Sequence, residues 1–180
     1  MQRNVPIPIG ALQVEAGNSG KIGYRLTYTG TIKIVAFVSG AWRYITPAES
    51  GAYGEVNGAA QDKLVYFAGD ITSALFEYDA EVIISNDNVS TLSIPQACEY
   101  ITLYQSDALT SVLYTDGVCN VKRVHGHAWT TTQRDILIQI IQDSTVSDGK
   151  LYIGKYDTYK DAVATVATAK GWQTILVIGQ

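Results

Sequence analysis

The middle of the chain, from residue 82 to residue 124, alternates short apolar segments with polar turns at a nearly constant interval. The apolar segments are centred about ten residues apart, which is the spacing of short strands in all-β folds. Turn-forming residues, chiefly Asn, Asp, Pro and Gly, lie between them. If two such steps make one coil, the coil repeats about every twenty residues. The segments are marked by Ile84, Ile94, Leu103, Leu113 and Val124.

Residues 1–68 are predicted to form a separate N-terminal β domain, a small sandwich or barrel-like sheet. Apolar and polar residues alternate over 24–28 and 31–38, and Gly30 is expected to separate these two strands. The glycine-rich stretch 50–58 is expected to be a mobile loop, serving either as a plain hairpin connection or as a contact to a partner or sugar through Tyr53.

The pattern changes from a strand period to a helical period near residue 130 and predicts a helix over about 132–142. Thr132 and Asp135 have the spacing of a capping box. The predicted buried face consists of Ile136, Leu137, Ile140 and Ile141.

A second helix is predicted over about 158–170, with Thr158 as its N-cap and Gly171 as its C-terminal stop. Residues 69–180 are therefore predicted to be a short stack of strand coils closed by an α/β cap. The predicted buried face of this helix consists of Ala162, Val163, Val166 and Ala167.

Composition favours a β protein and excludes some partners. Hydrophobic residues make up 47% of the chain and charged residues only 17%, with 12 Tyr and 16 Gly. A net charge of −4 and a pI near 5.1 argue against a nucleic-acid partner. The N-terminus lacks the apolar core of a signal peptide, and no run has the length of a membrane span. We therefore expect a protein made in a cytoplasm, with no membrane partner, that leaves only by a route such as lysis.

Two cysteines and two histidines are candidates for specific chemistry. Cys98 and Cys119 are one predicted coil apart, which is compatible with stacked buried thiols or with a disulfide. His125 and His127 have alternating spacing that places both rings on one face of a strand. They are expected to make polar surface or inter-subunit contacts, with a transition-metal site as the alternative; neither a metal nor a cofactor is predicted.

Acidic residues gather near the start of the repeats, and the default expectation for them is a solvated turn face. Glycoside hydrolysis, which would depend on Asp79 or Asp87, and calcium binding are the alternatives. No nucleophile elbow, P-loop or dinucleotide fingerprint occurs, so no catalytic residue is predicted. The acidic residues concerned are Asp70, Glu77, Asp79, Glu81 and Asp87.

Aromatic side chains are the main candidates for binding. Packing in the core is the default expectation for them, and stacking on sugar rings by aromatic residues exposed in a row is the alternative. Trp129 and Trp172 belong to the same group of candidates, Trp172 as a core residue beneath the helical cap. The predicted binding residues are Trp42, Tyr44, Tyr53, Tyr104 and Tyr114.

The last fifty residues resemble a known family. The helix with Ile136–Ile141, the strand from Gly149 to Ile153 and the helix stop from Ala169 to Trp172 are similar in order to the closing unit of bacteroidete-type leucine-rich-repeat proteins, which occur in phages and in their gut-bacterial hosts. The repeats before it lack the regular Asn of that family, and residues 1–68 are outside the resemblance.

The resemblance implies a leucine-rich-repeat-like β-solenoid after the N-terminal β domain, and a non-enzymatic role. It implies a bacteriophage virion structural protein, a head decoration or a fibre or tail-appendage component, that contacts other virion proteins or copies of itself. The alternative is a carbohydrate- or receptor-binding module that recognises a host surface glycan.

Overall fold

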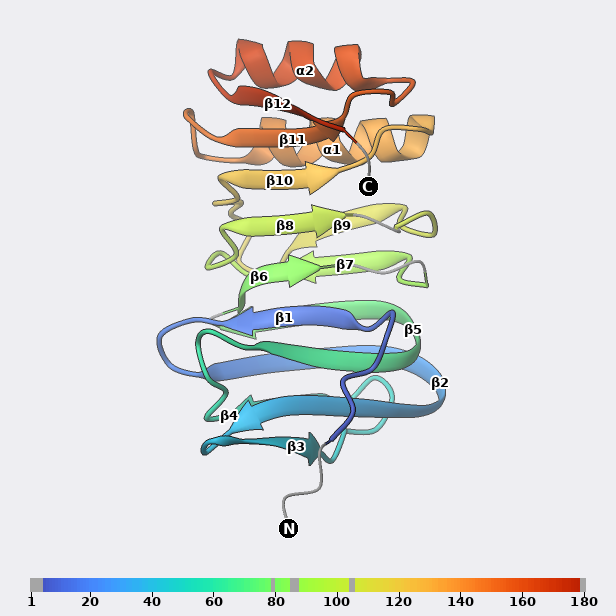
Figure 1. Cartoon of the computed structure of the whole chain (residues 1–180), viewed down its shortest axis with the longest axis vertical. Coiled ribbons are helices and arrows are strands. Elements are labelled where there is room, and N and C mark those ends of the chain that lie inside the picture. The colour runs from blue at the N-terminus through green and yellow to red at the C-terminus, as the bar shows by residue number, and fades with distance from the viewer. Residues whose placement is uncertain (1–4, 79, 85–87, 104–105, 179–180) are drawn as a thin grey trace.

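The computed structural model describes residues 5–78, 80–84, 88–103 and 106–178. Its strands belong to one 12-stranded sheet that curls into two layers around one hydrophobic core (Figure 1). The prediction of a mainly β protein is confirmed. The described elements are β1 (Leu12–Ala16), β2 (Lys21–Val38), β3 (Ala41–Ile45), β4 (Tyr53–Asn57), β5 (Leu64–Tyr78), β6 (Ala80–Ile84), β7 (Thr91–Ile94), β8 (Tyr100–Leu103), β9 (Ser111–Tyr114), β10 (Arg123–Gly126), α1 (Thr131–Asp143), β11 (Lys150–Gly154), α2 (Lys160–Ala169) and β12 (Gln173–Val177).

One layer contains a parallel ladder in the order β6, β8, β10, β11, β12. Val82 pairs with Tyr100 and Tyr100 pairs with Arg123, so the chain returns to this layer after about twenty residues. In the other layer, β7 and β9 continue a parallel ladder from the C-terminal part of β5. The predicted interval of about ten residues therefore corresponds to strands that alternate between the two layers.

Helices α1 and α2 occupy the layer opposite β10, β11 and β12 (Figure 1). Thr130, not Thr132, caps α1: its hydroxyl accepts the Gln133 N–H at 3.2 Å, and the Gln133 side chain accepts the Thr130 N–H at 3.1 Å. The predicted N-cap of α2 is also wrong, because Tyr159 precedes the helix and makes no side-chain cap bond. The predicted face of α1 is buried throughout, whereas in α2 only Val163 and Ala167 are buried.

The N-terminal part is a curled antiparallel sheet in which β2 and β5 each run through both layers. The first half of β2 pairs with β4 and with the second half of β5, and its second half pairs with β3 and with the first half of β5. The register shifts between Thr29 and Lys33, next to Gly69 with φ +139°, so a bulge forms the corner. Gly30 therefore lies inside one bent strand, and the predicted break into two strands is wrong. The predicted boundary after residue 68 falls within β5.

The stretch 50–58 contains strand β4 rather than only a loop, which corrects the prediction there. A Cβ on Gly54 would lie 2.3 Å from the Tyr24 ring, so glycine is required here for close packing. Tyr24 is buried, and its hydroxyl accepts the Ala48 N–H at 3.1 Å. The glycine that indicated mobility thus allows a buried ring to lie against the backbone.

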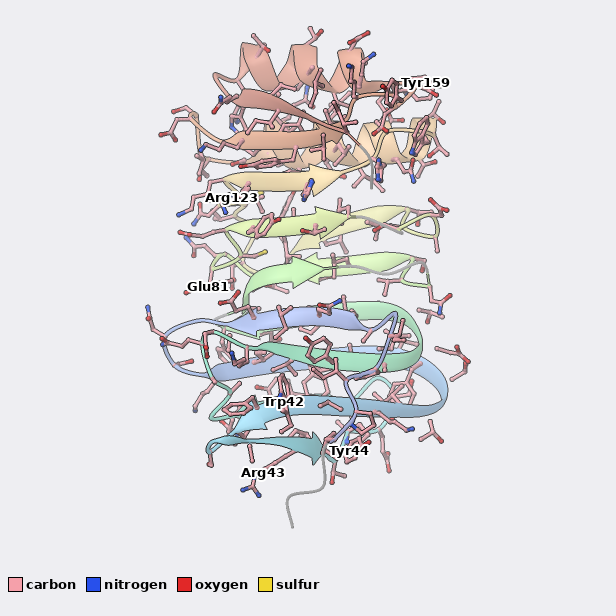
Figure 2. All side chains as sticks on the ribbon, in the orientation of Figure 1. Trp42, Arg43, Tyr44, Glu81, Arg123 and Tyr159 are labelled. Atoms are coloured by element: carbon pink, nitrogen blue, oxygen red, sulfur yellow. The ribbon has the colours of Figure 1, made fainter. Side chains whose placement is uncertain are left out.

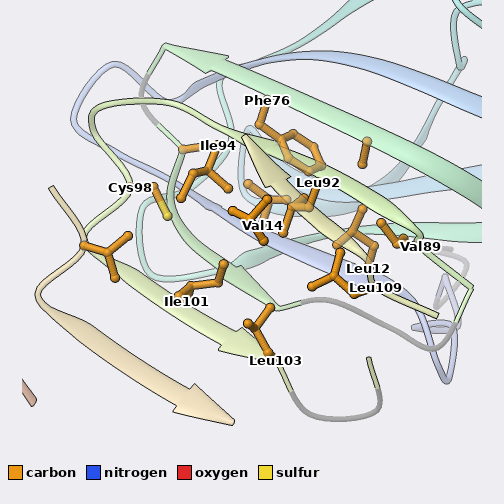
Figure 3. Close-up of a cluster of buried hydrophobic side chains, with 14 of the residues drawn as sticks. Leu12, Val14, Phe76, Val89, Leu92, Ile94, Cys98, Ile101, Leu103 and Leu109 are labelled. Atoms are coloured by element: carbon orange, nitrogen blue, oxygen red, sulfur yellow. The ribbon is translucent and has the colours of Figure 1, made fainter. Parts of the chain in front are cut away.

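The antiparallel part and the stacked strands share their core. Figure 3 shows Val14 of β1, Phe76 of β5, Leu92 of β7 and Ile101 of β8 among the buried side chains between the layers. All four are fully buried. The N-terminal sheet therefore covers one end of the stack with apolar contacts.

Candidate functional site

Two predicted binding residues lie on β3, the strand at one end of the sheet order (Figure 2). Trp42 is half-buried, and its ring lies 5.4 Å from that of Phe37 and 5.9 Å from that of Tyr66. Tyr44 is 55% exposed. Trp42 therefore packs against the neighbouring strands at the end of the sheet, while Tyr44 is accessible to a partner.

The remaining predicted aromatic residues do not form one row. Tyr53 is exposed on β4, and its hydroxyl donates to Glu55 Oε2 at 3.1 Å. Tyr114 is half-buried on β9, where burial raises the pKa of its hydroxyl and nearby Cys119 and Asp143 raise it further. Tyr104 lies outside the described residues, as do Asp79 and Asp87 of the acidic group.

Both cysteines are free and buried, which agrees with the expected buried thiols and not with the alternative of a disulfide. Burial raises the pKa of both thiols, and the Cys98 pKa is raised further by the nearby Cys119. Buried thiols with raised pKa values are poor nucleophiles, because the thiolate is the reactive form. Their role is packing.

The two histidines make different contacts. The His125 ring lies 5.2 Å from that of Tyr152, and burial lowers its pKa, with His127 lowering it further. His127 Nδ1 lies 3.2 Å from Oδ1 of Asp157. Within the described residues, no three His, Cys, Asp or Glu side chains converge on a metal position.

Asp157 is a buried carboxylate that sequence reasoning missed. Its side chain is fully buried and accepts the Ala128 N–H at 2.8 Å in addition to its contact with His127. It thereby joins the loop after β10 to the loop after β11. The adjacent cavity, which His127, Ser106 and Gln133 line, has a volume of only about 10 Å³. That volume holds about one water, so this pair is a structural connection.

An open surface lies at the C-terminal end of the stack, between α2 and β12. A groove of about 530 Å³ lies there. Beside it, Leu176 is 49% exposed and Ile178 is 69% exposed. The Thr174 hydroxyl is buried and has no hydrogen-bond partner among the described residues. The groove is lined by Asp161, Ala164, Thr165, Thr168, Ala169 and Thr174.

The backbone of β12 is paired on one side only within the described residues. The Gln173 N–H donates to the Gly149 carbonyl and the Val177 carbonyl accepts from Lys155, each at 2.9 Å, so both point toward β11. Peptide groups alternate in direction along a strand, so those of Thr174 and Leu176 point to the open edge. This edge has the geometry to accept another strand or loop.

No helix in the described part of the chain is both long and apolar enough to cross a membrane. We compared the chain with known protein families, curated proteins and solved structures and found no match.

Proposed function

We propose that the chain is a non-enzymatic structural module, a short leucine-rich-repeat-like β-solenoid that binds neighbouring subunits through its ends. A virion structural protein, as a head decoration or as part of a fibre or tail appendage, fits this role. The similarity of the last fifty residues to the closing unit of phage-associated leucine-rich-repeat proteins supports the assignment. The parallel ladders, with about twenty residues per coil, are compatible with it.

The observation that carries the proposal is the open surface of α2 and β12. The unit of α1 and β11 is covered by the unit of α2 and β12: β12 pairs with β11, and Lys170 Nζ donates to the Gln142 carbonyl at 2.8 Å. No further strand or helix covers α2 and β12 within the described residues. Their groove and open edge therefore offer a neighbouring subunit the same kind of surface that α1 and β11 offer to α2 and β12.

The opposite end of the sheet offers a second unpaired edge. Strand β3 pairs with β2 alone in the described part of the chain, and Tyr44 is exposed on it. Ile7 and Ile9 are also exposed, at 46% and 102%. Unpaired edge strands with exposed apolar side chains favour strand addition between chains, so a second copy or another virion protein is the expected partner.

Sedimentation velocity over a range of protein concentrations tests the proposal. We expect wild-type protein to self-associate and Leu176→Lys to weaken this association at least tenfold, because a charge on an edge strand opposes strand addition. Leu113→Lys is the matched control, since Leu113 is 51% exposed on β9, whose other edge faces α1 through the bond from Gln139 Nε2 to the Val112 carbonyl. A wild-type protein that stays monomeric throughout, or equal effects of the two substitutions, contradicts the proposal.

A further inference from the structure

A polar groove of about 390 Å³ opens at the side of the stack, away from both ends of the sheet. This volume lies within the range of small-molecule sites in proteins. Its described lining combines one aromatic ring, two carboxylates and two amides. The lining residues are Tyr78, Gln96, Ala97, Glu99, Asp116 and Asn120.

Register places three of these residues one above another. Leu75 of β5 pairs with Ser93 of β7, which pairs with Leu113 of β9. Three residues beyond each paired position come Tyr78, Gln96 and Asp116, at the carboxyl ends of successive strands. The Gln96 N–H donates to Asp116 Oδ2 at 3.0 Å, which fixes two of the three levels against each other. The groove therefore crosses several coils along the stack.

The aromatic wall is held in place. Tyr78 is 57% exposed, and a Cβ on Gly23 would lie 2.9 Å from its ring, so the ring rests against the Gly23 backbone. Tyr78 also has φ +61°, a left-handed conformation that is unfavourable for a bulky residue. Such backbone strain is found preferentially at binding sites, where it helps to position a side chain before the ligand arrives.

The polar lining retains hydrogen-bonding capacity. Both bonds to Asp116 from the described residues, from Gln96 N–H and Thr115 Oγ1, use Oδ2, so Oδ1 is left to accept from a ligand. Asn120 Oδ1 accepts from Thr145 Oγ1 at 2.6 Å, which leaves its amide N–H groups as donors. The Glu99 carboxylate pairs with Lys122 Nζ. The groove thus presents donors and acceptors with a local excess of negative charge.

We propose that this groove binds a neutral saccharide, with one sugar ring against the exposed face of Tyr78 and sugar hydroxyls donating to Asp116. A hydroxyl-rich ligand matches the mixture of carboxylate acceptors and amide donors. The carboxylates disfavour phosphate, sulfate and acidic sugars through like-charge repulsion. None of the lining residues belongs to the α2–β12 surface, so a failure of the saccharide proposal does not contradict the assembly proposal, and the reverse also holds.

The experiment is a screen of the full chain on an array of bacterial and host glycans, followed by calorimetric titration with the strongest neutral oligosaccharide. Asp116→Asn should weaken binding at least tenfold, because a neutral amide takes the place of the charged carboxylate that accepts the sugar hydroxyl. Tyr78→Gly should also weaken binding at least tenfold. It removes the ring but relieves the positive φ, so the fold is retained.

Tyr156→Ala and Asp62→Asn are matched controls, since Tyr156 is 69% exposed and the Asp62 side chain is 77% exposed, both outside the groove. Both controls should bind like wild type. Amide NMR shifts on titration should fall on Gln96, Asp116 and Asn120. Binding to no neutral glycan, a preference for lysine-containing peptides or acidic glycans, or equal losses in the controls overturns the proposal.

Discussion

Removing the buried carboxylate of Asp157 should destabilise the C-terminal end of the stack. In Asp157→Ala the backbone bond from the Asp157 N–H to the Gly154 carbonyl, at 3.2 Å, can persist, so the substitution isolates the side chain. Two interactions are lost: the bond from the Ala128 N–H at 2.8 Å and the contact with His127 Nδ1 at 3.2 Å. Ala128 is fully buried, so its N–H has no ready access to water.

The magnitude follows from these two losses. A buried donor left without an acceptor costs roughly 1–3 kcal/mol. The His127 side chain is 22% exposed and is able to turn toward water, so its share is smaller, about 1 kcal/mol. We therefore expect Asp157→Ala to lower the free energy of unfolding by about 2–4 kcal/mol. Asp157→Asn keeps one carbonyl acceptor for Ala128, and its loss should be about half as large.

Urea unfolding at neutral pH, followed by far-UV circular dichroism, measures these differences. Asp161→Ala is the control, because the Asp161 side chain is 91% exposed and its change should stay within about 0.5 kcal/mol. In Asp157→Ala, hydrogen exchange should show that amides of α2 and β12 lose protection before amides of β2 and β5 do, since Asp157 joins the loops beside the terminal units. A loss below about 0.5 kcal/mol in Asp157→Ala would refute the reasoning that an orphaned Ala128 N–H is costly.

Two further predictions concern packing and pH. A Cβ on Gly149 would lie 2.3 Å from the ring of Trp172, which is buried and donates its indole N–H to the Val146 carbonyl at 2.8 Å. Gly149→Ala should therefore lower the free energy of unfolding by about 1–3 kcal/mol and alter the tryptophan emission in the same urea titration. An unchanged urea midpoint contradicts this packing argument. The pKa of His125 is lowered from 6.5 by burial and by His127, so the unfolded chain takes up the proton first and stability falls as pH drops below about 6.5. His125→Gln should flatten thermal stability between about pH 7 and pH 5, and a profile with the wild-type slope contradicts this.

Sequence reasoning succeeded where a local pattern determines the structure. The spacing of apolar segments follows from strand length and turn length, and it predicted strands about ten residues apart and a coil of about twenty residues. The face of α1 with Ile136 and Ile140 follows from helical periodicity alone, because both residues must be buried together. Gly171, with φ +86°, follows α2 as the predicted stop.

It failed where distant residues determine the structure. Gly54 reads locally as flexible, but its lack of a side chain accommodates the ring of Tyr24, which precedes it by thirty positions in the chain. Asp157 reads as a turn residue, and only the packing of the loop after β11 against the loop after β10 reveals what it accepts. The placement of the aromatic candidates likewise depends on strand pairing, because Tyr53 and Tyr114 lie on strands that do not pair with each other.

The groove illustrates how a stacked architecture brings separated residues together. Tyr78, Gln96 and Asp116 differ in type, so no repeat of residue identity indicates them. What they share is their separation in the sequence, because each comes three positions after one of the paired residues Leu75, Ser93 and Leu113. Once coils stack in register, each turn places its residue directly beside the one from the turn before. A change in the turns of one coil therefore changes one level of the groove while the buried strands remain paired. A binding surface on the turns is thus free to vary in its ligand without altering the core that holds it.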